Sequence, residues 1–129
     1  MKANSKEIKI TSDSLVMDIQ KSFNLFYPYL KVEFSTNPQG ILSLKNHVVT
    51  PETNVGKITK IPASVTIDLN EDRTIYEIEQ DFAKQLGLLL QVFRKSGKVW
   101  NEISLTDTWT LDSQNKAGEF ISTEMAAAW

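Results

Sequence analysis

Apolar and polar positions change period three times over the first part of the chain. Residues 7–11 alternate and are rich in isoleucine, which is typical of a half-buried strand. Over residues 15–27 the apolar side chains recur at spacings of three and four, which predicts an amphipathic helix. Pro28 disfavours helical geometry at the residue before it, so this helix should end there. Residues 29–35 alternate again and predict a second strand.

The same succession returns in the second half of the chain. Residues 64–69 alternate and predict a strand. Thr74 and Glu77 have the spacing of a capping box, in which each side chain accepts a hydrogen bond from a backbone N–H group at the helix start. Gly87 predicts the end of that helix, because glycine enters the left-handed region without penalty. Residues 88–95 then predict another strand.

The two halves overlay when the sequence is shifted by 59 residues. Under this shift Ile8 falls on Ile67 and Phe23 on Phe82, and the two helix ends also coincide. Two copies of one β-α-β unit would produce this register. Two unrelated amphipathic units would also resemble each other, so the sequence leaves internal duplication open.

These elements predict an α+β fold in a single domain over residues 1–129. Two β-α-β units, 8–35 and 64–105, would form one mostly antiparallel sheet with both helices on one face, as in ferredoxin-like folds. The second unit would include a C-terminal hairpin. Residues 36–62 would form an irregular connection, which is too apolar to be a free linker, and 106–129 a C-terminal segment with a short helix.

The hairpin QVFRKSGKVW, residues 91–100, brings aromatic and cationic side chains together. If residues 96–97 form its loop, Phe93 lies opposite Trp100. The two rings then share the face of the sheet that is turned away from the helices. Residues 106–129 either cover this aromatic pair or leave it as a contact surface.

Composition and charge remove several classes of function. The chain contains no cysteine, which excludes disulfides, thiolate metal sites and cysteine nucleophiles. Its 16 acidic and 14 basic residues give a net charge of −2, whereas nucleic-acid-binding proteins usually carry a basic excess. The N-terminal residues lack the apolar run of a signal peptide, and the longest apolar run, LGLLL, is too short to span a bilayer. We therefore expect a cytoplasmic protein without membrane contact.

Candidate catalytic and metal-binding groups are few. His47 is the only histidine, and neither an acid nor a second metal ligand flanks it. Glu77 and Asp81 share a helical face, but the solvated outer face of a helix explains that pair better than chemistry does. The sequence has neither a calcium loop nor a glycine-rich phosphate loop. We therefore expect no catalytic residue, no bound metal and no cofactor.

A non-enzymatic protein-binding module that uses the hairpin 91–100 is the function that these observations favour. The residues predicted to bind the partner are the aromatic and basic side chains of the hairpin and the segment after it: Phe93, Arg94, Lys95, Lys98, Trp100 and Trp109. A nucleic-acid-associated protein using the same hairpin is the alternative, although the net charge disfavours it. An enzyme using His47 is the third hypothesis, and a homo-oligomer is compatible with each.

Three segments resemble an uncharacterised family of small bacterial proteins. They are DIQKSFNLFYPYLKVEF (18–34), LQVFRKSGKVW (90–100) and TDTWTLDSQNKAG (106–118). The family has no assigned activity, so the resemblance transfers no catalytic residue, but it implies that the hairpin and the WTL..QN segment form one unit. Residues 65–100 also resemble the β-grasp fold of ubiquitin in the order of strand, helix, glycine stop and basic hairpin strand. That second resemblance concerns fold alone.

Overall fold

The structure is a computed structural model that describes residues 6–36, 47–61 and 64–125. Its strands and helices, in chain order, are β1 (Glu7–Ile10), α1 (Val16–Phe26), β2 (Leu30–Thr36), β3 (His47–Val48), η2 (Val55–Lys57), β4 (Val65–Asp68), α2 (Ile75–Leu86), β5 (Leu89–Ser96), β6 (Val99–Glu102), α3 (Leu111–Glu119) and η3 (Phe120–Met125). None of the helices among these residues is long and apolar enough to cross a membrane.

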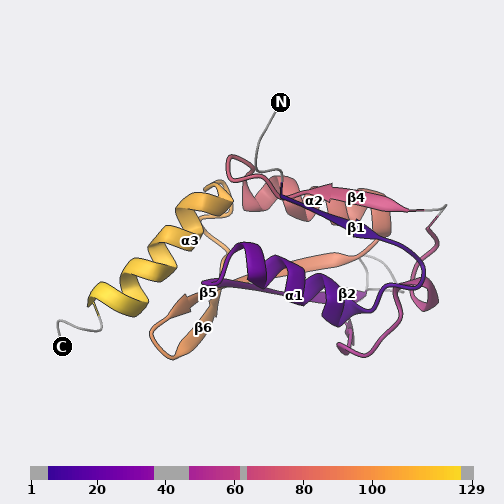
Figure 1. Ribbon diagram of the computed structural model, residues 1–129, viewed down its shortest axis with the longest axis horizontal. Coiled ribbons are helices and arrows are strands. Elements are labelled where there is room, and N and C mark those ends of the chain that lie inside the picture. The colour runs from indigo at the N-terminus through magenta and orange to yellow at the C-terminus, as the bar shows by residue number, and fades with distance from the viewer. Residues whose placement is uncertain (1–5, 37–46, 62–63, 126–129) are drawn as a thin grey trace.

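The described strands lie in two antiparallel sheets. β1 pairs with β4, and the other sheet has the order β3-β2-β5-β6. Figure 1 shows β1 and β4 side by side along one side of the molecule, apart from the longer strands β2 and β5. The first strand of each predicted β-α-β unit therefore lies in one sheet and its second strand in the other.

The prediction of an α+β fold is confirmed, and the prediction of one sheet is wrong for the described residues. A ferredoxin-like arrangement, which needs both strands of each unit in the same sheet, is not confirmed. The physical reason is that alternation in a strand shows only that one face is buried. The alternation of β1 does not indicate whether its partner is β2 or β4.

One hydrophobic core joins both sheets and both long helices. Each helix contacts one strand of each sheet, because α1 lies against β1 and β2, and α2 against β4 and β5. Phe34 of β2 and Phe82 of α2 are fully buried and their ring centroids lie 5.0 Å apart. Such a tilted aromatic pair stabilises the core beyond the area that it buries.

The ends of α2 are those that the sequence predicts. The Thr74 hydroxyl accepts a hydrogen bond from the Glu77 N–H group at 3.1 Å, and the Glu77 carboxylate accepts one from the Thr74 N–H group at 2.9 Å. Gly87 has a φ of 65° and ends the helix in the left-handed conformation. The short helix of the C-terminal segment is also present as α3, and the Thr110 hydroxyl caps it by accepting from Ser113 N–H.

The two halves repeat one backbone arrangement. At the start of each long helix, two N–H groups donate to carbonyl groups of the segment that follows the last strand of the same half. These bonds are Val16 to Thr53 (2.9 Å) and Met17 to Pro51 (2.9 Å) in the first half, and Ile75 to Trp109 (3.2 Å) and Tyr76 to Asp107 (2.8 Å) in the second. The pairing of Ile8 with Ile67 joins two residues that the shift of 59 makes equivalent. Internal duplication, which the sequence left open, is thus matched by the backbone.

Candidate protein-binding surface

Strands β5 and β6 form the predicted hairpin, but its loop lies one residue later than predicted. Ser96 pairs with Val99, so the loop is Gly97 and Lys98. Gly97 has a φ of 69° at the first loop position, where two-residue hairpin loops favour glycine. With Ser96 there, a side chain would have to enter that strained region, which explains why the predicted loop is wrong.

The corrected register changes which residues face each other. Phe93 lies opposite Glu102, and Lys95 lies opposite Trp100. The predicted pairing of Phe93 with Trp100 is therefore wrong. Because the register differs by two residues, each side chain stays on the face that the alternation predicts, and the two rings become diagonal neighbours.

The four-stranded sheet has one face that is turned away from the core, which we call the outer face. In β2 the residues Leu30, Val32 and Phe34 are buried in the core, so the residues between them point to the outer face. Continued across the paired strands, the outer face carries Lys31, Glu33, Gln91, Phe93, Lys95, Trp100 and Glu102.

Lys31 is the centre of this outer face. Its ammonium nitrogen lies 5.4 Å from the centroid of the Phe93 ring and 5.3 Å from that of Trp100. The ammonium group of Lys95 lies 5.9 Å from the Trp100 ring. An ammonium group held near aromatic rings in this way stabilises an exposed site by about 0.5–1 kcal/mol. The two rings and the two lysines therefore form one ordered cluster rather than separate exposed side chains.

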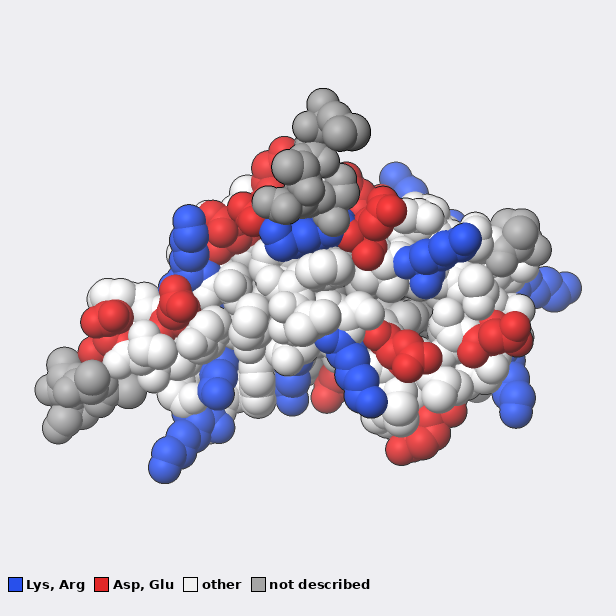
Figure 2. Space-filling model, viewed as in Figure 1, with Lys and Arg blue, Asp and Glu red and all other residues white. Residues whose placement is uncertain are grey.

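The lysines of this cluster have no carboxylate partner within the described part of the chain. The ion pairs shorter than 4.0 Å there join Lys6 to Glu71, Arg73 to Asp81, and Lys116 to Asp112. Figure 2 shows Lys and Arg side chains gathered around the hairpin of β5 and β6. Lys98 is exposed at its tip. Ammonium groups at this end of the sheet are thus available to carboxylates from outside the chain.

The structure does not bring all the predicted binding residues together. Phe93, Lys95 and Trp100 share the outer face, and Lys98 lies next to it in the loop. Arg94 points to the opposite face of β5, where its guanidinium donates to the buried side chain of Gln114 at 3.0 Å. Trp109 lies in the loop before α3, with 45% of its surface exposed.

The C-terminal segment packs on the side of β5 that carries Arg94. A side chain at Gly118 would meet the Cβ atom of Tyr29 at 2.8 Å and the Arg94 side chain at 3.1 Å, so α3 lies very close to the sheet there. The Ser122 hydroxyl then accepts from the Gly97 N–H group at the hairpin loop. The described residues of this segment, 106–125, pack on that side and do not cover the outer face. The segment contacts the hairpin through the bond from Gly97 to Ser122.

The sequence alone did not single out Lys31, because its role depends on a pairing between distant segments. Lys31 lies opposite Phe93, from a strand nearly half the chain away. The alternation of β2 placed it on the polar face, and only knowledge of the β2–β5 pairing would have placed it beside the rings.

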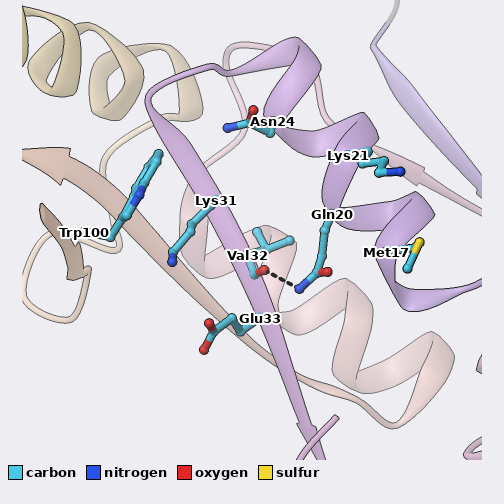
Figure 3. A pocket seen from close by; sticks show the side chains of 8 residues that line it. All are labelled: Met17, Gln20, Lys21, Asn24, Lys31, Val32, Glu33 and Trp100. Atoms are coloured by element: carbon cyan, nitrogen blue, oxygen red, sulfur yellow. Dashed lines mark hydrogen bonds between the residues drawn. The ribbon is translucent and has the colours of Figure 1, made fainter. Parts of the chain in front are cut away.

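A groove with a volume of about 400 Å³ adjoins the outer face between α1 and the edge of β2. Its lining residues come from α1, β2 and β6: Met17, Gln20, Lys21, Asn24, Lys31, Val32, Glu33 and Trp100 (Figure 3). The side-chain amide of Gln20 donates to the Val32 carbonyl at 3.0 Å, and that of Asn24 donates to the Leu30 carbonyl at 2.8 Å. The groove thus opens onto the backbone of β2 and ends at Trp100.

The other residues that the sequence offered as catalytic or metal-binding candidates lie in strands or helices, where they pair with neighbours. His47 is exposed on β3, where it pairs with Thr36. Asp81 pairs with Arg73, and Glu77 caps α2, so its hydrogen bonds to Thr74 lower the pKa of its carboxyl. Residues 6–36, 47–61 and 64–125 contain no group of three His, Asp or Glu side chains that could hold a metal ion.

Glu79 has a raised pKa that the sequence did not indicate. Its carboxyl is half-buried on α2, and burial is the largest cause that raises its pKa to about 7. The negative charges of Asp107 and Glu102 raise it further. These neighbours come from distant segments, so the helical pattern alone could not indicate the shift.

No family model matches the chain, and neither a curated protein nor a solved structure matches it. The resemblances to the bacterial family and to the β-grasp fold therefore stay predictions. The function has to be inferred from the residues of the outer face and of the groove.

Proposed function

We propose that this chain is a non-enzymatic module that binds another protein through the outer face around Phe93 and Trp100. The observation that carries this proposal is the position of the Lys31 ammonium group, 5.4 and 5.3 Å from the two ring centroids. Trp side chains held by neighbours in this way are typical of the residues that contribute most to protein–protein binding.

The partner segment that fits this surface carries carboxylates beside apolar side chains. Lys31, Lys95 and Lys98 form no ion pair within the described residues, so a partner carboxylate gains their charge without displacing another. The rings of Phe93 and Trp100 supply rigid apolar area at a low cost in side-chain entropy.

Nucleic acid fits the same surface less well. Rings and lysines on a sheet can stack bases and contact phosphates. However, Glu33 and Glu102 lie on the same outer face and would repel phosphates, and the chain carries a net charge of −2. We therefore place a protein rather than a polynucleotide on this face.

The proposal is tested by selecting peptides from a displayed random library on the immobilised full chain, and then measuring their affinity by fluorescence anisotropy. Trp100→Ala should weaken the selected peptides by about tenfold or more, because loss of a central aromatic residue costs more than about 1.4 kcal/mol. Trp109→Ala is the matched control, since Trp109 is an exposed tryptophan away from the outer face, and it should leave the affinity unchanged.

Two results would contradict the proposal. One is equal affinity of the selected peptides for the wild type and Trp100→Ala. The other is salt-dependent retention of the wild type on single-stranded polynucleotide that is lost in Trp100→Ala, which would establish the nucleic-acid alternative instead.

A further inference from the structure

One edge of β2 has no strand partner over much of its length. β5 pairs with β2 from Leu30 to Ser35, whereas β3 pairs with the other edge only at Ser35 and Thr36. Val49 adds one backbone bond to the Phe34 carbonyl. Within the described part of the chain, residues 30–33 therefore face the groove without a neighbouring strand.

The backbone of Val32 points into this groove. Val32 lies opposite Val92, and the Val92 carbonyl accepts from the Ile103 N–H group at 2.9 Å, so the polar groups of Val92 face β6. Opposed residues in an antiparallel pair turn their polar groups the same way relative to the pair, either both inward or both outward. The N–H and carbonyl groups of Val32 thus face the groove, and its carbonyl meets Gln20 there (Figure 3).

This edge is only partly closed. Helices often cover a free strand edge and so prevent strand addition. Here α1 reaches the edge only through the side-chain amides of Gln20 and Asn24, and the groove remains beside them. The Val32 carbonyl has a second lone pair, and the Val32 N–H group has no acceptor among the described residues. Val32 has only 2% of its surface exposed, so another backbone reaches these two groups by displacing the Gln20 side-chain amide from the groove.

We infer that the partner binds as an extended segment that adds antiparallel to β2 at Val32. This inference rests on the proposed function, because it specifies the conformation of the protein segment that the outer face recognises. An antiparallel strand suits a sheet whose described pairs are all antiparallel. Strand addition is a common mode of peptide recognition, in which backbone bonds supply affinity and alternate side chains supply specificity.

Charge fixes the side-chain pattern of this segment. The partner residues on either side of the one opposite Val32 lie on the outer face, next to Lys31 and Glu33. Opposite charges across a strand pair are favourable, so an acidic residue belongs beside Lys31 and a basic residue beside Glu33. Because the strands run in opposite directions, the segment reads basic, any residue, acidic from its N-terminus.

Two probe peptides test the pattern. The first is Thr-Val-Thr-Lys-Val-Glu-Thr-Val-Thr with blocked ends, and the second has its Lys and Glu exchanged. In titrations of the isotope-labelled full chain by NMR, the first peptide should bind about three- to tenfold more tightly, as two cross-strand charge pairs imply. The double variant K31E/E33K should reverse this preference.

The matched control exchanges a charge pair of the same spacing on another strand. Glu7 and Lys9 are exposed on β1, so E7K/K9E alters the same two charges away from the groove and should keep the wild-type preference. Equal binding of the two peptides, or an unchanged preference in K31E/E33K, would overturn the strand register.

Backbone pairing has its own readout. The bound peptide should slow hydrogen exchange of the Val32 amide by about tenfold or more, because that N–H group becomes hydrogen-bonded. N-methylation of the central Val of the probe removes the donor that would pair with the Val32 carbonyl, and it should abolish this protection. Peptide binding without protection of Val32 would show that only side chains dock.

The two proposals fail separately. If library-selected peptides need Trp100 but no peptide protects the Val32 amide, strand addition is wrong and the aromatic surface stands. If the probe protects Val32 while Trp100→Ala has no effect on any peptide, strand addition stands and the aromatic surface is wrong.

Discussion

The first half of the molecule, β1 to η2, and the second half, β4 to η3, share a backbone arrangement but differ in the elements after the central strand. In the first half β3 has two residues, and the last element of that half is the three-residue helical turn η2. In the second half β6 has four residues and α3 has nine. Among the described residues, the short β3 leaves Val32 without a strand partner at one edge of β2, whereas β6 carries Trp100 onto the outer face. The unpartnered edge and the aromatic cluster both arise from this difference.

Substitutions in the core shared by the two halves should have the largest effects on stability. Phe23 and Phe82 are equivalent under the shift of 59 residues, and both are fully buried. Phe23→Ala and Phe82→Ala should each lower the free energy of unfolding by about 3–5 kcal/mol, since each leaves a cavity in the core. Urea denaturation measures both values. A cost below about 1 kcal/mol for only one of them would show that the halves do not contribute equally to the core.

A smaller effect concerns Glu79, whose equivalent in the first half is Gln20. Because the pKa of Glu79 rises from 4.5 to about 7 on folding, the folded state binds its proton more tightly than the unfolded state. The stability that this proton supplies is present below pH 4.5 and is lost as the pH rises to about 7. Glu79→Gln should therefore stabilise the protein by about 1–2 kcal/mol above that range, after discounting for solvent screening.

The comparison is made by thermal or urea unfolding on both sides of the titration. Below pH 4.5 the variant and the wild type should have nearly equal stability, because the wild-type carboxyl is then protonated in both states. A stability difference that does not change with pH would show that the shift is absent.

The helix caps distinguish the halves by about 1 kcal/mol. Thr74 caps α2 with its hydroxyl, whereas Leu15 at the equivalent position of α1 has no side-chain acceptor. Thr74→Ala should lower the free energy of unfolding by about 1 kcal/mol, as loss of an N-cap side chain usually does. Chemical denaturation with an unchanged m-value checks this. Thr74→Ser, which keeps the hydroxyl, should remain within about 0.5 kcal/mol of the wild type.

The smallest expected effect concerns the contact between β2 of the first half and the rings of the second. Lys31→Gln removes the ammonium group next to Phe93 and Trp100 and should cost only about 0.5–1 kcal/mol in stability. It should also alter the near-ultraviolet circular dichroism of Trp100, while Lys9→Gln on β1 should not. An unchanged aromatic signal would mean that Lys31 does not order the rings in solution.

Local signals in the sequence predicted the parts of the fold that depend on local chemistry. Thr74 and Gly87 set the ends of α2, because a cap and a left-handed glycine act within one turn of their own backbone. The α+β class followed from the spacing of the apolar residues, which alternate in the strands and recur every three or four residues in the helices. Within the hairpin the faces of Phe93 and Trp100 were right, but the loop was displaced because Gly97, not Ser96, takes the first loop position.

The features that the sequence could not predict depend on pairing between distant segments. The alternation of β1 is satisfied by either sheet, so its pairing with β4 was missed. Lys31 joins the rings only because β2 lies beside β5. Arg94 is close in sequence to the other predicted basic residues, but the alternation of β5 turns it to the opposite face. There its guanidinium donates a hydrogen bond to the Gln114 side chain.

The exchange of strands between the halves bears on how the protein is made. β1 and β2 find their long partners in β4 and β5, at residues 65–68 and 89–94. The first half therefore leaves the ribosome before the long partner strand of β1 or of β2 has been synthesised. Until the later residues emerge, that half exposes unpaired strand edges and the apolar face of α1. The nascent chain is therefore most prone to aggregate midway through translation.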